Sequence, residues 1–159
     1  MKVIFLDIDG VLNSRDYDRR RNWAESSDID VTRLPLLKSL VDATGAKIVL
    51  SSTWRTHWNA DRSKCDADGK YITDTFAEYG LTVYDKTPDL GFSADRADEV
   101  KAWLNEAKLS GERVESFVII DDYGFGWGEL ADMLVKTDPH KGLGLEREHT
   151  EKAIAILNR

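Results

Sequence analysis

Apolar runs and amphipathic stretches alternate along the chain, and this alternation predicts strands separated by helices. The apolar runs predict strands over residues 2–8, 46–51, 81–85, 116–121 and 133–137. Strands that alternate with helices form a parallel sheet that is covered on both faces. The pattern therefore predicts an α/β fold with a parallel sheet flanked by helices.

Apolar residues at helical spacing predict the helices, and polar residues or glycine mark their ends. Thr32 is expected to cap a helix that stops at Gly45. A second helix is expected over residues 93–108, with Ser93 as its cap. A short helix around Leu130 and a terminal helix complete the pattern.

Two polar segments separate the first strands from the elements that follow them. Residues 13–30 form a polar flap, and residues 55–79 are expected to be partly helical, with an interruption at the turn-like CDADGK. Neither segment is long enough for an independent lid domain, and no repeat or linker divides the chain. We therefore expect a single domain over residues 1–159, with an open site that admits a bulky substrate.

The composition is that of a soluble globular protein: 42% of the residues are hydrophobic and 32% are charged. No apolar run approaches the roughly 20 residues of a membrane span, and the N-terminal run is too short for a signal peptide. A single cysteine permits no internal disulfide. These features together predict a cytoplasmic protein that does not enter a membrane.

The net charge of −7 argues against a broad nucleic-acid-binding surface, because such surfaces use clustered lysine and arginine. A local basic patch exists in the segment RDYDRRRN, which contains Arg15, Arg19, Arg20 and Arg21. This patch is either a solvated surface turn or a grip for the phosphate of a substrate. Its position just beyond the first strand makes it a candidate grip, with Arg19 and Arg20 as candidate substrate contacts, and the surface turn stays the alternative.

The segment VIFLDIDGVLNS is the strongest candidate for chemistry. Its apolar run is expected to deliver Asp7 and Asp9 to the same face, because alternate side chains of a strand share a face. Gly10 then lets the chain turn without a Cβ in the site. Two buried like charges require a cation or a shared proton, and Mg²⁺ prefers such oxygen ligands. The alternative is an ordinary Asp-Gly turn at the end of a strand.

Two more apolar runs end in polar clusters. AKIVLSSTWR, from Ala46 to Arg55, ends in hydroxyl groups, and SFVIIDDYGFG, from Ser116 to Gly126, carries paired aspartates. The carboxyl ends of parallel strands meet at one edge of the sheet, where α/β proteins bind their ligands. The three clusters together predict a site for metal-assisted phosphoryl transfer.

The motifs DxDGV, LSSTWR and IIDD and the tail LVKTDPHKGLG together resemble the haloacid dehalogenase (HAD) superfamily of phosphohydrolases. The closest resemblance is to the HAD domain of Swiss Army Knife RNA-repair proteins, and it spans nearly the whole chain. It implies a Rossmann-like, HAD-type fold with a minimal or absent cap domain. It also implies a Mg²⁺-dependent phosphomonoesterase that forms an aspartyl-phosphate and acts on a nucleotide or a phosphorylated nucleic-acid end.

The resemblance also implies roles for the acidic residues. Asp7 matches the nucleophile, and Asp9 matches the general acid and base, whose backbone carbonyl joins the metal shell. Asp122 is expected to bind Mg²⁺ directly, with Asp121 as its supporting partner. The alternative for the last pair is a capping or turn role.

Hydroxyl and cationic side chains complete the implied site. Ser51 matches the hydroxyl that binds a phosphoryl oxygen, with Ser52 as its near competitor. The family usually has a lysine as the third motif, and here Arg96 occupies the matching place while Lys101 lies further along. Arginine binds phosphate but is not equivalent to lysine, so the choice between the two stays open.

Trp54 and Arg55 follow the serines. Trp54 is a candidate for stacking on a nucleotide and Arg55 for contact with its phosphate. Packing is the alternative for the tryptophan. His57, His140 and His149 form no metal-spaced cluster, and we expect them on the surface. Two other functions stay open: a receiver-like phosphoacceptor and a catalytically silent nucleic-acid-binding module. The order of the motifs disfavours a receiver. The oligomeric state cannot be predicted.

Overall fold

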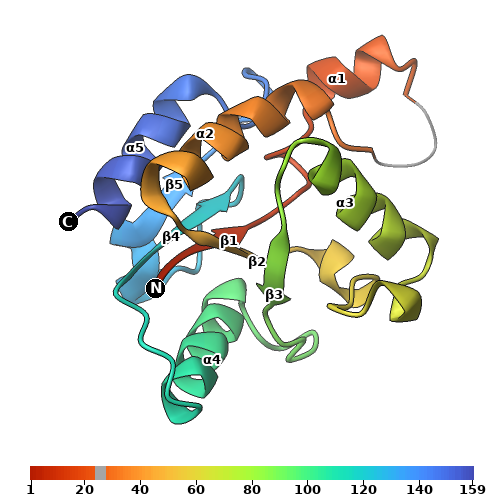
Figure 1. Cartoon of the computed structure of the whole chain (residues 1–159). Coiled ribbons are helices and arrows are strands. Elements are labelled where there is room, and N and C mark those ends of the chain that lie inside the picture. Colours follow the sequence, from red (N-terminus) through yellow and green to blue (C-terminus); the bar gives the residue numbers. More distant parts are fainter. Residues whose placement is uncertain (24–27) are drawn as a thin grey trace.

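The computed structural model describes residues 1–23 and 28–159, and its centre is one parallel sheet (Figure 1). The strands lie in the order β3-β2-β1-β4-β5. Their bounds are Lys2–Leu6 for β1, Lys47–Leu50 for β2, Val83–Lys86 for β3, Ser116–Asp121 for β4 and Leu134–Lys136 for β5. All neighbouring strands pair in parallel, which confirms the predicted Rossmann-like α/β fold.

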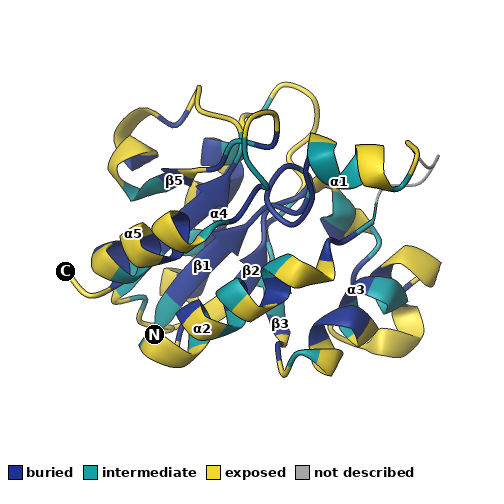
Figure 2. Cartoon of the chain, turned by 90° about the horizontal axis from the view of Figure 1, so that it is seen from above, coloured by how far each residue is buried: buried dark blue, intermediate teal, exposed yellow. Residues whose placement is uncertain are grey.

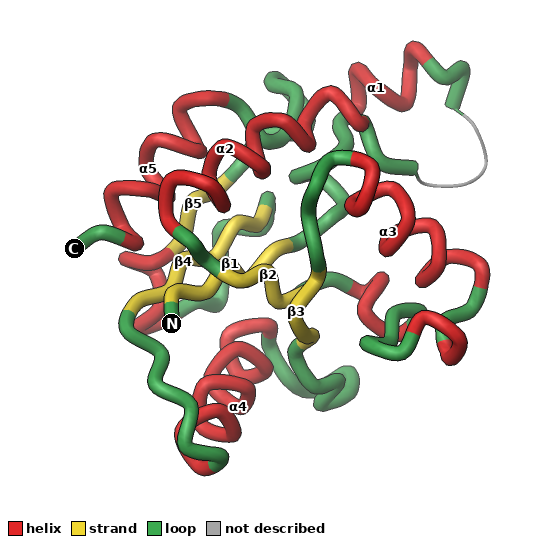
Figure 3. Tube along the Cα trace, viewed as in Figure 1, coloured by secondary structure: helices red, strands yellow, loops and turns green. Residues whose placement is uncertain are grey.

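Helices cover both faces of the sheet, as Figures 1 and 3 show. On one face lie α2 (Leu34–Thr44), α3 (Ala67–Glu78) and α5 (Arg147–Leu157), which pack against the even-numbered core residues of β1, such as Ile4. On the other face α4 (Arg96–Leu109) packs against Phe5. Figure 2 shows the central strands as buried over most of their length, with less buried residues at their starts. The two covered faces explain their continuous apolar runs.

Several predicted helix ends are wrong. Thr32 does not cap α2, whose N-cap is Arg33 without a side-chain bond. Asp30 instead caps the 3-10 turn Val31–Arg33 that leads into α2, and its carboxylate accepts bonds from both the backbone N–H and the hydroxyl of Thr32. Similarly, Asp95 rather than Ser93 is the N-cap of α4. Aspartate is as good an N-cap residue as serine or threonine, so the sequence alone does not show which of these neighbouring residues is the cap. Gly45 is in the left-handed conformation and ends α2 as predicted.

The segments after β1 and β2 are short. The expected flap contains α1 (Arg15–Arg20), while its residues 24–27 lie outside the described residues. The stretch CDADGK does not interrupt a helix but begins α3, because the side chain of Asp66 caps its first turn. None of the helices in the described residues has the length and apolar character that would be needed to cross a membrane.

Candidate active site

The register of the sheet brings the predicted motifs to one edge. Leu6 of β1 lies opposite Leu50 of β2 and Ile120 of β4. The next residue on each strand is therefore at the carboxyl edge, and two backbone bonds fix this alignment: Asp7 N–H to Ile120 C=O (3.0 Å) and Ser51 N–H to Leu6 C=O (2.8 Å). Polar residues from three separate motifs consequently meet at this edge.

Three carboxylates meet there. Asp7, Asp121 and Asp122 each offer an oxygen, and these oxygens lie within 4.8 Å of one another. Asp7 and Asp121 are almost completely buried, at 3% and 1% exposed. Asp9 is not in this group, because β1 ends at Leu6 and the alternation of a strand no longer applies to residues 7–9. The predicted metal role of Asp9 therefore finds no support in this group of carboxylates and stays a prediction.

Gly10 makes room for the third carboxylate. Its φ is +80°, and a Cβ added to it would lie 2.4 Å from the Oδ2 atom of Asp122. The Thr137 hydroxyl donates to the Gly10 carbonyl (2.7 Å) and fixes this turn in place. The turn predicted after the DxD pair thus needs glycine for two reasons, its backbone conformation and the space that it leaves.

Arg96 is the cation that contacts the carboxylates. Its Nη1 atom lies 2.9 Å from Asp7 Oδ2 and 2.8 Å from Asp121 Oδ2, and it also donates to the Ser51 carbonyl (2.8 Å). Lys101, the other candidate, is on the same helix but pairs with Glu129 (3.0 Å). The structure therefore brings Arg96, and not Lys101, to the group formed by Asp7 and Asp121.

The electrostatics of the group favour a bound cation. Burial raises the pKa of Asp7 to about 7; Arg96 opposes this rise, and the neighbouring Asp121 adds to it. Burial also raises the pKa of Asp121, again against the effect of Arg96. Among the described residues the group thus contains three carboxylates, of which Arg96 contacts two. Carboxylates are the hard oxygen donors that Mg²⁺ prefers. The residues present fit such an ion, with Asp7, Asp121 and Asp122 as its ligands.

The two candidate serines differ in their surroundings. Within the described part of the chain, the Ser51 hydroxyl is buried and has no hydrogen-bond partner. The Ser52 hydroxyl, by contrast, accepts a bond from the Trp54 backbone N–H (3.3 Å), and its proximity favours the ionised form of Asp7. A buried polar group without a partner is costly. The Ser51 hydroxyl is therefore available to form a hydrogen bond with a ligand oxygen.

Asp9 is held by two donors from different segments. The Trp54 indole N–H donates to its Oδ2 (3.0 Å), and the Asn13 amide donates to its Oδ1 (3.0 Å). The same Asn13 side chain accepts a bond from the Gly10 N–H (2.8 Å). Trp54, a candidate for stacking, is thus engaged with a carboxylate by its polar edge, and Asn13 was missed although it stands four residues after Asp9.

The other predicted cations have partners within the fold. Arg55 is 7% exposed and forms an ion pair with the buried Glu99 (2.6 Å). In the basic patch, Arg19 and Arg20 both bond to Asp16. The structure therefore does not bring these three arginines to the carboxylates, and contact between Arg55 and a substrate is confined to its small exposed part.

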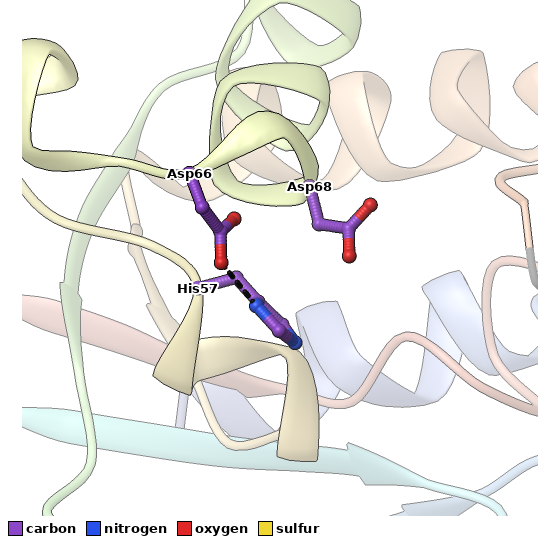
Figure 4. A group of neighbouring side chains, drawn as sticks. All are labelled: His57, Asp66 and Asp68. Atoms are coloured by element: carbon purple, nitrogen blue, oxygen red, sulfur yellow. Dashed lines mark hydrogen bonds and ion pairs between the residues drawn. The ribbon is translucent and has the colours of Figure 1, made fainter.

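A second group with metal-ligand chemistry, shown in Figure 4, has a structural explanation. It contains His57, Asp66 and Asp68 and is exposed. The His57 ring bonds to one oxygen of Asp66 (2.5 Å), and the other oxygen of Asp66 caps α3. His149, expected on the surface, is buried and accepts a bond from the Glu146 N–H (3.0 Å). His57 and His149 thus each contact the residue that caps the start of a helix, and this explains where their rings lie.

Aromatic residues around the edge were also missed. Tyr123 and Phe125 follow the aspartate pair directly, are exposed, and pack edge to face at 5.7 Å. Phe92, in the loop before α4, is fully exposed. Their signal was present in the sequence: DDYGFG places two aromatic residues directly after the aspartate pair.

Comparison with known proteins identifies a family. The family model described as "HAD domain in Swiss Army Knife RNA repair proteins" matches residues 3–147. That range contains all three motifs at the sheet edge. No curated protein and no solved structure matches the chain.

Proposed function

We propose that this chain, which belongs to the family of HAD domains in Swiss Army Knife RNA repair proteins, is a Mg²⁺-dependent phosphomonoesterase. The observation that carries the proposal is the cluster of Asp7, Asp121 and Asp122 at the carboxyl edge of the sheet, in which Arg96 contacts Asp7 and Asp121. The substrate is a nucleotide or the phosphorylated end of a nucleic acid.

Asp7 acts as the nucleophile in this proposal. Its carboxylate oxygen attacks the phosphorus atom and forms an aspartyl-phosphate, while the bond to the leaving oxygen breaks. Mg²⁺, held by the three carboxylates, would neutralise charge so that an anionic phosphate can approach them. The Arg96 guanidinium and the vacant Ser51 hydroxyl are available to bind phosphoryl oxygens.

Asp9 transfers the protons. It donates a proton to the leaving oxygen in the first step and takes one from water in the second, when that water attacks phosphorus and restores the Asp7 carboxylate. The bonds from Trp54 and Asn13 keep the Asp9 carboxylate in one orientation. Trp54 is therefore a positioning residue in this proposal, since it acts on the substrate through Asp9.

Exposed aromatic side chains support a nucleotide rather than a sugar as the rest of the substrate. A hollow of 330 Å³ contains both Arg96 and Phe92 in its wall, so a phosphate at Arg96 would leave its attached group beside an aromatic ring. Stacking of a base on an aromatic ring contributes about 1–3 kcal/mol. Tyr123 and Phe125 offer further faces next to the metal ligands.

Phosphate release from an aryl phosphate tests the proposal. The purified protein should turn over the substrate with Mg²⁺ and lose activity in excess chelator, and Asp7→Asn should lower kcat by several orders of magnitude. Asp42→Asn is the matched control, because Asp42 is an exposed carboxylate that pairs with Lys38 on the surface of α2. Undiminished turnover in chelator, or near-normal kcat in Asp7→Asn, would contradict the mechanism.

A further inference from the structure

A basic pocket lies between α1 and the loop that follows β5. It has a volume of 470 Å³. The side chains that carry its chemistry are Arg15, Arg19, Trp23, His140 and Lys141. None of them belongs to the group of carboxylates, so the basic pocket is a feature of its own.

The charge of the basic pocket is opposite to that of the chain. Arg15, Arg19 and Lys141 are cations, and among the described residues Asp16 is the one acid in the wall, whereas the whole chain has a net charge of −7. Asp16 is also shared with Arg20, which bonds to it at 3.0 Å from outside the pocket. The charge of Asp16 is therefore largely offset, and the basic pocket attracts anions.

The guanidinium of Arg15 stacks on an aromatic ring. Its Cζ atom lies 5.6 Å from the centroid of the Trp23 ring, and both side chains are exposed. Stacking limits the freedom of the guanidinium while its N–H groups stay available to an anion. Arg15 is thus prepared to bind a phosphate with little further loss of conformational entropy.

Both walls of the basic pocket are attached to the loop that carries Asp7 and Asp9. The Arg15 N–H donates to the Pro139 carbonyl (2.9 Å), which joins α1 to the opposite wall. The Leu145 N–H donates to the Val11 carbonyl (2.7 Å), which joins that wall to the loop. The basic pocket is consequently attached to the loop that follows Asp7 and Asp9.

We propose that the basic pocket binds an internal phosphodiester of a single-stranded nucleic acid whose terminal phosphate lies at Asp7. This inference rests on the proposed function and deepens it, because it separates a polynucleotide end from a mononucleotide as the substrate. A phosphodiester carries the single negative charge that arginine and lysine bind, and the Trp23 ring provides a face for a neighbouring base. A free nucleotide would leave this pocket empty.

The four arginines of the predicted basic patch do not all line the basic pocket. Arg15 and Arg19 line the basic pocket, but Arg20 reaches towards Asp30, which is buried at 2% exposed and lies 3.7 Å from the Arg20 guanidinium. Arg21 is likewise directed to Asp28 (3.7 Å). Two of the four arginines therefore face the substrate in this proposal, and the other two hold the segment that carries them.

Equilibrium binding tests the pocket without relying on catalysis. The probe is a fluorescently labelled single-stranded oligonucleotide that lacks a terminal phosphate, prepared as RNA and as DNA of one sequence. The double variant Arg15→Ala/Lys141→Ala should weaken binding about tenfold and lower the slope of log Kd against log salt by about 1 or 2. The RNA and DNA arms identify which phosphodiester chain is preferred.

The control is Arg62→Gln/Lys64→Gln, which removes two exposed cations outside the pocket. This variant should keep the Kd and the salt slope of the wild type. Equal losses in both double variants, no loss in either, or no binding by the wild type at low salt would overturn the proposal. Failure of the pocket proposal is distinguishable from failure of the proposed function. The latter would appear as an absence of phosphate release from every substrate.

Kinetics provide a second measurement. The pocket variant should raise KM for an end-phosphorylated oligonucleotide about tenfold more than it raises KM for an aryl phosphate. A purely structural role would instead lower kcat on both substrates together. That parallel loss would overturn the assignment of Arg15 and Lys141 to substrate binding.

Discussion

The metal-free protein should become less stable as the pH rises from about 5 to about 7. Asp7 has a pKa of 3.8 when unperturbed and about 7 in the folded chain, because burial disfavours its charge. The folded state therefore holds a proton that the unfolded state has released in this range. Stability is greatest while both states are protonated, and it is lost as the pH passes through the folded value.

The size of the expected loss in unfolding free energy follows from the difference between the unperturbed and folded pKa of Asp7. Each pH unit between them costs about 1.4 kcal/mol for a single group, so the free energy of unfolding should fall by about 2–3 kcal/mol between pH 5 and pH 7. The raised pKa of Asp121 acts in the same direction. Mg²⁺ binds the ionised carboxylates, so the stabilisation by the metal should grow with pH over the same range.

Urea unfolding from about pH 5 to about pH 8, in chelator and in millimolar Mg²⁺, measures both effects. Asp7→Asn provides the control, because asparagine has the same shape but does not titrate; its pH dependence should be flatter and its response to Mg²⁺ smaller. A wild-type stability that is level from pH 5 to pH 7 in chelator would refute the reasoning. An Asp7→Asn variant that keeps the full slope would refute the assignment to Asp7.

Three further substitutions examine the site. Gly10→Ala should destabilise the protein by about 1–2 kcal/mol through its left-handed backbone, and it should weaken Mg²⁺ binding because the added Cβ meets Asp122. In the control Gly45→Ala the added Cβ meets nothing within 4 Å, so urea unfolding should show only the backbone cost. Equal Mg²⁺ affinity in the two variants would contradict this. Arg96→Ala should lower kcat/KM for an aryl phosphate by about 10- to 100-fold, whereas Lys101→Ala should stay within about twofold of the wild type, and the opposite ranking would place the functional cation at Lys101. Ser51→Ala should lower kcat/KM about tenfold without lowering Tm, since the hydroxyl has no partner among the described residues; a lower Tm with unchanged kinetics would make its role structural.

The architecture was predictable because hydrophobic periodicity determines it. Each apolar run forms a parallel strand, and the rule that carboxyl ends gather at one edge predicts that Asp7, Ser51 and Asp121 lie together. The first strand is shorter than predicted, because β1 ends at Leu6. The alternation of a strand therefore gives no information on the direction of Asp9.

The identity of the cation depended on where one helix begins. Arg96 is the first helical residue after the Asp95 cap, and Lys101 lies about 140° further around the helix axis. The two cations therefore face different sides of α4, and the sequence does not show which side faces the carboxylates. Contacts between distant segments, such as the bond from Trp54 to Asp9, have no periodic signal in the sequence.

The central claim is that Asp7 becomes phosphorylated, and chemical trapping tests it most directly. The wild-type protein is mixed with an aryl phosphate and Mg²⁺, quenched during turnover and reduced with borohydride, which converts an aspartyl-phosphate into homoserine. Peptide mass mapping should then find homoserine in place of Asp7. Steady phosphate release with an unmodified Asp7, or homoserine at Asp121 or Asp122 instead, would contradict the account.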